Sequence, residues 1–334
     1  MSILIGLFVE FLSIIAVKNN LLIFNNSPPY AIHKKNKGEQ WRLFDKEIGP
    51  WHKPMSKDRH IRRCFDVNYQ SNNIGARDNM DYDKVYFNKS TILLGDSFAE
   101  GFGVNLEETF AKIIEKSTNK KIINLGVAGS NTSNNLKRFI KFTKNKNYAE
   151  IIYFLLPEND FIDDKIDLEL NEGLKKKDKI LKENYKKNFK EIMILYGSSY
   201  FYSYNLLRTI KFFIYEGSDY YHDNSFHYKN KKAINKILDN VFEVLSIEEK
   251  EKTLIIIPSR GDMTYQKNNT EKNYKQLYWY NEIYKRSKNN NVKLIDLMDF
   301  ANLDIQYKYF LDCDPHWNKY GNEFAAKIYL ENIK

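Results

Sequence analysis

The length, composition and charge of the chain allow one large domain with extensions. Its 334 residues can bury a full core, and aromatic side chains make up 15% of them, which is ample for packing. The net charge is +9, but lysine is spread along the whole chain and no zinc-finger or RNA-binding motif is present, so we expect no nucleic-acid partner. The two cysteines, Cys64 and Cys313, could pair in an oxidising compartment, but we expect two free thiols.

Residues 1–24 contain an apolar stretch that predicts a membrane anchor. Residues 3–17 correspond to one short span, with Glu10 inside it and Lys18 at its end. A full span needs roughly 20 apolar residues, so an uncleaved or atypical signal sequence and a buried or peripheral helix are alternatives. By the positive-inside rule, the lysines that follow argue for a cytoplasmic main domain. These lysines are Lys18, Lys34, Lys35 and Lys37.

Residues 25–88 separate this stretch from the main domain. They are rich in Asn, Asp, Lys and Pro and contain few periodic stretches. We interpret them as an irregular arm that packs on the following domain, residues 89–334. The expected anchors of the arm are Trp41, Trp51 and Phe65.

The main domain contains five apolar runs of the kind that form buried parallel strands. They are residues 91–94, 121–125, 151–156, 253–258 and 292–297. Helical patterns lie between them, with apolar residues on one face. Strands that alternate with helices imply right-handed βαβ units and a three-layer α/β/α sandwich.

One long segment, from about residue 163 to residue 250, interrupts this alternation. It contains a lysine-rich part (165–190), an aromatic part (200–204) and a helix that ends near Leu245. We interpret it as a mostly helical insertion. It could cover the active site as a cap, or it could be a solvated decoration of the scaffold.

The segment 91–104 carries the strongest chemical signal of the chain. An apolar run of strand type ends abruptly in Gly95-Asp96-Ser97, and a polar turn and a helical pattern follow. This order predicts a serine hydroxyl at the carboxyl end of a strand, the edge where open α/β sheets bind ligands. A serine needs a base that a third group orients, and His316 near the other end of the chain is a candidate.

Other binding motifs do not match the chain. The spacing from Gly95 to Gly103 is not that of a P-loop, and Gly101-Phe102-Gly103 lacks the third glycine of a dinucleotide fingerprint. Ala99 stands where the nucleophile elbow of an α/β-hydrolase has its second glycine. We therefore expect no cofactor.

Two groups of residues could be read as metal ligands. One consists of Asp312, Asp314 and His316, and the other consists of His222, Asp223 and His227. No second ligand cluster supports the first group, and a solvated loop explains the second, so we expect no metal.

Four short blocks, in order, make the chain resemble the SGNH hydrolases, also called the GDSL esterase/lipase family. The blocks are Gly95-Asp96-Ser97, the run 124–131, Pro157-Glu158-Asn159-Asp160 and Asp314-Pro315-His316-Trp317-Asn318. The resemblance covers roughly residues 89–333. It implies a flavodoxin-like α/β/α sandwich with a five-stranded parallel sheet.

The resemblance also implies a role for each site residue. Ser97 would attack an ester carbonyl, and His316 would take its proton and later return one to the leaving group. Asp314 would fix the tautomer of the imidazole and stabilise the imidazolium. The oxyanion would bind the N–H groups of Ser97 and Gly129 and the side-chain amide of Asn159.

The fourth block departs from the usual family pattern. The acid usually sits three residues before the histidine, where this chain has Cys313, whereas Asp314 sits two before it. The third block also begins with Pro157 in place of the usual glycine. An Asp-x-His-Trp spacing resembles the sugar O-acetyltransferase branch associated with exopolysaccharides. We expect Trp317 in the core and Asn318 as a helix cap.

These expectations define a function. The resemblance implies a serine-dependent acyl-ester hydrolase or O-acyltransferase that acts on a small-molecule or glycan ester, with O-acetylated carbohydrate the expected substrate class. A lipid or thioester hydrolase is one alternative, and an inactive, glycan-binding member of an export or modification complex is another. The family implies an extracytoplasmic domain, against the lysine count, so the side of the membrane stays open. No oligomeric state follows from the sequence.

Overall fold

The computed structural model describes residues 2–18, 41–62, 64–161, 203, 230–247, 250–268, 273–312 and 314–333. Most of the expected insertion lies outside these residues, as do His222, Asp223 and His227.

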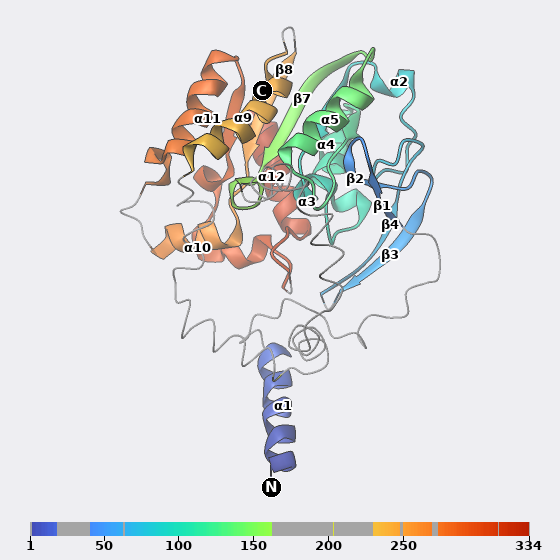
Figure 1. Cartoon of the computed structure of the whole chain (residues 1–334). Coiled ribbons are helices and arrows are strands. Elements are labelled where there is room, and N and C mark those ends of the chain that lie inside the picture. Colours follow the sequence, from blue (N-terminus) through green and yellow to red (C-terminus); the bar gives the residue numbers. More distant parts are fainter. Residues whose placement is uncertain are drawn as a thin grey trace, which may run out of the picture.

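A five-stranded parallel sheet forms the centre of the described part of the chain, in the order β6-β5-β7-β8-β9 (Figure 1). The strands are β5 (Ser90–Leu94), β6 (Ile122–Asn124), β7 (Tyr148–Leu155), β8 (Glu251–Ile256) and β9 (Lys293–Asp296). All five predicted strands are present. Numbered along the sheet, the order is 2-1-3-4-5, which is that of flavodoxin-like folds. The predicted fold class is therefore confirmed.

Helices cover both faces of this sheet, as the predicted three-layer arrangement requires. Helices α4 (Phe110–Thr118) and α12 (Lys319–Asn332) contact each other on one face. On the other face, α9 (Lys231–Leu245) lies between α5 (Thr132–Thr143) and α11 (Tyr278–Asn289). The helix expected to end near Leu245 is thus α9, which connects β7 to β8.

Shorter helical elements complete the described fold. They are α2 (Lys84–Phe87), α3 (Ser97–Glu100), α10 (Arg260–Asn268) and the 3-10 helices η2 (Leu106–Glu108), η4 (Tyr274–Gln276), η5 (Leu297–Phe300) and η6 (Leu303–Tyr309).

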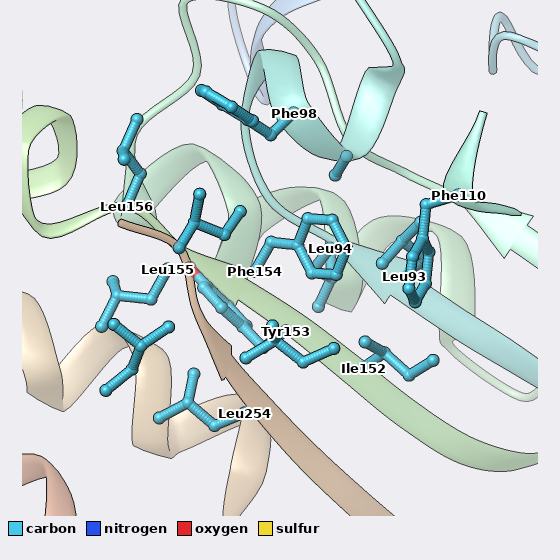
Figure 2. Close-up of a cluster of buried hydrophobic side chains, with 14 of the residues drawn as sticks. Leu93, Leu94, Phe98, Phe110, Ile152, Tyr153, Phe154, Leu155, Leu156 and Leu254 are labelled. Atoms are coloured by element: carbon cyan, nitrogen blue, oxygen red, sulfur yellow. The ribbon is translucent and has the colours of Figure 1, made fainter. Parts of the chain in front are cut away.

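The core gathers around β7, the central strand of the sheet (Figure 2). Because helices cover both faces, the strand is apolar almost throughout, and six of its eight residues in succession, from Glu150 to Leu155, are buried. Phe154 meets the edge of Phe110 at 4.8 Å and that of Trp317 at 5.9 Å between ring centroids. Trp317, next to His316, is 2% exposed and belongs to the core, as expected.

The described part of the arm contains two antiparallel hairpins that the sequence analysis did not predict. The strands are β1 (Arg42–Asp45) with β2 (Gly49–His52), and β3 (Lys57–Arg62) with β4 (Phe65–Gln70). These strands are short and contain many polar residues, so they lack the continuous apolar runs that predicted the strands of the main sheet. A signal was present in β4, where Phe65, Val67 and Tyr69 alternate with exposed Asp66 and Asn68.

The three expected anchors of the arm are buried. Trp41 is 3% exposed, Trp51 4% and Phe65 9%. Trp51 also donates from its indole N–H to the Ile74 carbonyl at 2.7 Å. These aromatic side chains hold the hairpins against the sheet domain, because burying each ring removes a large apolar area from water.

Helix α1 (Ser2–Lys18) stands apart from the sheet and its covering helices (Figure 1). Its apolar side chains are exposed, among them Leu4 at 72%, Leu7 at 63% and Phe8 at 61%. The carboxylate of Glu10 accepts hydrogen bonds from the N–H and the hydroxyl of Ser203. In the described part of the chain, no helix combines the length and the apolar character that a membrane crossing needs.

The expectation of free thiols is wrong. Cys64 is disulfide-bonded, and no described cysteine is free. The other cysteine of the sequence, Cys313, lies outside the described residues. The sequence could not predict this bond, because a spacing of this length carries no information about which cysteines meet in space.

Candidate active site

The turn after β5 places Ser97 at the carboxyl edge of the sheet. Gly95 has φ +150°, and a Cβ there would lie 2.8 Å from the Cβ of Phe154 and 2.9 Å from that of Ala99, so the turn needs glycine. Asp96 then caps α3 by accepting a hydrogen bond from the Phe98 N–H at 2.9 Å. Ser97 is the first residue of that helix and is 6% exposed.

The structure brings Ser97, His316 and Asp314 together in one chain of hydrogen bonds. The Ser97 hydroxyl lies 2.6 Å from Nε2 of His316, and Nδ1 of His316 makes a short contact with Oδ1 of Asp314. The same carboxylate oxygen accepts from the backbone N–H of His316 at 3.1 Å. Asp312, the competing acid, is exposed. This is the nucleophile–base–orienting group arrangement of serine hydrolases.

Aromatic rings hold the imidazole in this position. The centroid of Phe102 lies 4.3 Å from that of His316, and the centroid of Phe98 lies 5.2 Å from it. The side chain of His316 keeps 21% of its surface exposed. The rings shield part of the imidazole from water and leave an edge that a substrate can reach.

The side chain of Asn159, the expected side-chain donor, is oriented by Asp96, the residue before the serine. Its amide donates one hydrogen bond to Oδ2 of Asp96 at 3.2 Å, which leaves the second N–H of the amide for a ligand. Burial raises the pKa of Asp96, while the Phe98 N–H, His316 and Asn159 oppose that rise. The carboxyl group of Asp96 therefore both caps α3 and orients the amide of Asn159.

Gly129, the expected backbone donor, lies in an open position. Its φ is +75°, and no atom comes within 4 Å of the place where a Cβ would stand. No described residue accepts a hydrogen bond from the N–H of Gly129 or of Ser97. Both groups are thus available for an oxyanion.

Two buried charged residues beside this site were missed by the sequence analysis. Glu100 and Arg138 are both 0% exposed, and both bond to the loop that carries Gly129. Arg138 lies on the buried face of α5 beside Phe139, but this face also carries Thr132, Asn135 and Thr143, so it is hard to recognise in the sequence. A charged side chain on such a face is buried with partners more often than it is placed there at random.

Comparisons with known proteins find similar solved structures and no related sequence. No family model matches the chain, and no curated protein matches it. Among solved structures, a member of the lipolytic protein G-D-S-L family from Veillonella parvula is 14% identical and covers 72% of this chain and 96% of its own, with a TM-score of 0.37.

Two further solved structures are similar to the chain. A lipase/acylhydrolase from Enterococcus faecalis is 14% identical, with 73% of this chain and 95% of its own covered and a TM-score of 0.39. The psychrotrophic esterase EstA from Pseudoalteromonas is 15% identical, with 74% and 97% covered and a TM-score of 0.35. Similarity at this level of identity and TM-score assigns no function to this chain.

Proposed function

We propose that this chain is a serine-dependent acyl-ester hydrolase or O-acyltransferase of the SGNH type. The observation that carries the proposal is the 2.6 Å contact between the Ser97 hydroxyl and Nε2 of His316, whose Nδ1 contacts Asp314. A hydroxyl bonded to an imidazole that a carboxylate orients is suited to nucleophilic attack on an acyl carbon.

The reaction follows from this geometry in two steps. Oγ of Ser97 attacks the ester carbonyl carbon while its proton moves to Nε2 of His316, and the oxyanion forms beside the N–H groups of Ser97 and Gly129 and the amide of Asn159. The carbon–oxygen bond to the leaving group then breaks, and His316 returns the proton to the departing oxygen. Water or an acceptor hydroxyl next attacks the acyl-enzyme by the reverse sequence, which yields an acid or a new ester.

O-acetylated carbohydrate is the substrate class that we propose. Support comes from the Asp314-Pro315-His316-Trp317 spacing, which resembles that of the sugar O-acetyltransferase branch. The exposed edge of His316 and the open space at Gly129 would admit a polar ester. Release of free acetate from an acetylated glycan would indicate hydrolysis, and appearance of acetyl groups on an added glycan would indicate transfer.

Replacing the nucleophile tests the proposal directly. Ser97→Ala should reduce the turnover of an aryl acetate to background and remove labelling by a fluorophosphonate probe, because no acyl-enzyme can form. The matched control is Ser117→Ala on the exposed face of α4, which should react like the wild type. Turnover by Ser97→Ala near the wild-type rate would sink the serine mechanism.

We further propose that α1 attaches the enzyme to a membrane. Its 17 residues extend about 26 Å at the usual helical rise, short of the ~30 Å of a bilayer core, but its exposed apolar side chains can enter the lipid without a full crossing. The disulfide at Cys64 favours the extracytoplasmic side, since structural disulfides persist in oxidising compartments. A surface glycan ester would be accessible on that side.

A further inference from the structure

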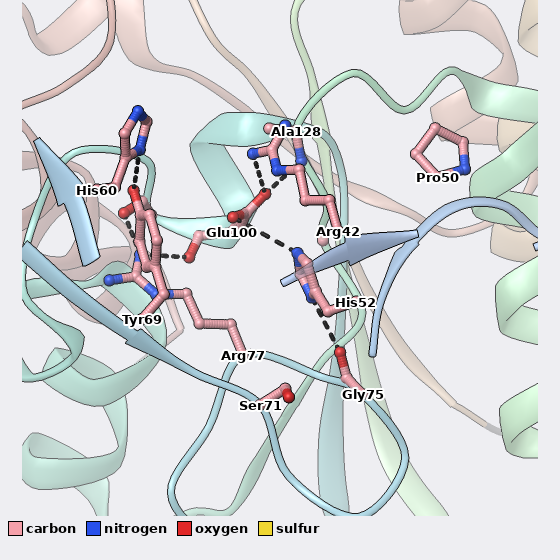
Figure 3. Close-up of polar contacts among 12 residues, drawn as sticks. Arg42, Pro50, His52, His60, Tyr69, Ser71, Gly75, Arg77, Glu100 and Ala128 are labelled. Atoms are coloured by element: carbon pink, nitrogen blue, oxygen red, sulfur yellow. Dashed lines mark hydrogen bonds and ion pairs between the residues drawn. The ribbon is translucent and has the colours of Figure 1, made fainter. Parts of the chain in front are cut away.

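A buried carboxylate connects the helix of the nucleophile to the loop of the expected oxyanion donor. Glu100 is the last residue of α3, three positions after Ser97, and is 0% exposed. Its Oε2 accepts a short hydrogen bond from the N–H of Ala128, the residue immediately before Gly129 (Figure 3). The orientation of the Ala128 peptide therefore depends on Glu100, and the next peptide carries the Gly129 N–H.

The N-terminal arm supplies the partners that make this buried charge tolerable. Nη2 of Arg42 lies 3.5 Å from Oε2 of Glu100, and Nε2 of His52 lies 3.6 Å from Oε1 (Figure 3). His52 is itself 0% exposed, and its Nδ1 lies 2.9 Å from the Gly75 carbonyl, to which it donates. Both side chains come from the β1–β2 hairpin.

These contacts set the ionisation of Glu100. Burial by itself raises the pKa of a carboxyl group, but attraction to His52 and Arg42 and the bond from the Ala128 N–H outweigh it. The pKa of Glu100 is held well below its usual range. The carboxylate thus stays charged, and a charged acceptor makes a stronger hydrogen bond to Ala128 than a neutral one.

A second buried side chain holds the same loop from the other side. Nε of Arg138 donates to the Leu125 carbonyl at 3.0 Å, and Nη2 makes a short bond to the hydroxyl of Ser130. Nη1 donates to the carbonyl of Pro50 in β2 at 3.3 Å. Arg138 therefore fixes the loop at Leu125 and Ser130, and Glu100 fixes it at Ala128, and both charged side chains contact the β1–β2 hairpin.

Stability is a weak reason for such an arrangement. Burying an ion pair removes both charges from water, and well-packed apolar residues in its place are often as stable or more so. An apolar residue at position 100 would pack but would leave the Ala128 N–H without its acceptor. The glutamate therefore serves to fix the position of the loop, and not to stabilise the fold.

We propose that Glu100 is a positioning residue for the Gly129 oxyanion donor, and that the β1–β2 hairpin is an integral part of the active site. This inference rests on the proposed function of Ser97. In the transition state, the Gly129 N–H must point to the oxyanion, and Glu100 maintains that direction through Ala128. The hairpin maintains Glu100 through Arg42 and His52.

Kinetics of four variants of the full chain test this inference, with an aryl acetate as the substrate. Glu100→Leu keeps the volume and removes the acceptor, and it should lower kcat at least about tenfold with KM within about threefold, because a misplaced donor affects the transition state alone. Glu100→Gln keeps an acceptor for Ala128 and should recover most of that loss. Arg42→Ala should lower kcat a few-fold. Its matched control is Arg59→Ala, an arginine of the other hairpin that pairs with Asp66, which should behave like the wild type.

The results of these variants test the positioning role of Glu100 separately from the serine mechanism. A folded Glu100→Leu variant with wild-type kcat, or with a change in KM alone, would overturn the positioning role while the serine mechanism stood. If thermal unfolding shows that Glu100→Leu does not fold, the Arg42→Ala variant provides the test instead. A kcat of Arg42→Ala equal to that of Arg59→Ala would then overturn the inference. A wild-type protein without turnover or labelling at Ser97 would overturn both proposals.

Discussion

At the scale of single residues, two aspartates compete for the role of triad acid. The structure places Asp314 against Nδ1 of His316 and leaves Asp312 exposed. Pro315 restricts its own φ and disfavours the helical region for the residue before it, so Asp314 is not drawn into the turn of helix that would carry its carboxylate away. In the proposed triad, the acid is therefore Asp314, two residues before the histidine.

Substituting each aspartate separates them. Asp314→Asn should lower kcat by orders of magnitude, since the amide would hold the wrong tautomer of His316. Asp312→Asn, the matched control, should lower kcat less than tenfold. The steady-state kinetics of the two variants give the ranking, and the reverse order would move the acid to Asp312. If neither variant loses activity, a Ser–His dyad operates.

The amide of Asn159 provides a second test at this scale. Asn159→Ala removes one preorganised donor and should reduce kcat by about 10²–10³. Because Asp96 would keep its bond from the Phe98 N–H, α3 should stay capped and the melting temperature should change little. A reduction in kcat below tenfold would mean that Asn159 only shapes the turn after β7.

At the scale of elements, α1 differs from all the helices that cover the sheet. Those helices bury an apolar face, as α9 does with Ile234, Ile237 and Val241, whereas α1 exposes Leu4 and Phe8. An exposed apolar helix on a water-soluble protein promotes association unless a membrane or another protein covers it. A lipid surface is the partner that we propose.

Fractionation of cells measures the contribution of α1. The full chain should sediment with membranes, and a chain that begins near Asn25 should remain in the supernatant. A full-length variant with Leu7→Asp and Phe8→Asp should also shift to the supernatant, because charges on these exposed positions oppose insertion. Equal partitioning of all three proteins would exclude α1 as the anchor.

At the scale of the whole molecule, a buried carboxyl group links folding to pH. Asp296 ends β9 at the same sheet edge as the site, and burial raises its pKa from 3.8 to about 6, although the Tyr274 hydroxyl opposes that rise. The folded protein therefore holds this proton more tightly than the unfolded chain does. The stabilisation is complete below pH ~4 and is lost as the pH rises through about 6.

This linkage predicts a change in the free energy of unfolding. From this group alone, the free energy should fall by up to about 3 kcal/mol between pH 4 and pH 7. Asp296→Asn keeps an acceptor for the Met298 N–H and removes the titration, so its urea-unfolding free energy should depend less on pH. The control is Asp304→Asn, whose carboxylate is exposed. Identical pH slopes for the wild type and Asp296→Asn would contradict the assignment.

The sequence by itself determined the sheet and the blocks of the candidate site. Strands β5, β6 and β7 are largely apolar and buried, and β8 ends in an apolar run. This pattern is local, because both faces of a parallel strand inside the sheet are covered. Ser97 and Asn159 follow such runs directly, so their position at one sheet edge could also be predicted. His316 and Asp314 could be predicted because they are close together in the chain.

Only the tertiary structure decided how the arm completes this site. The hairpin strands are short and polar, and Glu100 meets Ala128 across 28 positions of the chain. The disulfide of Cys64 could not be predicted from the sequence either. Each of these contacts joins residues far apart in the chain, and a buried polar group has the same local sequence as a solvated one. Its burial depends on which partners the fold brings to satisfy it.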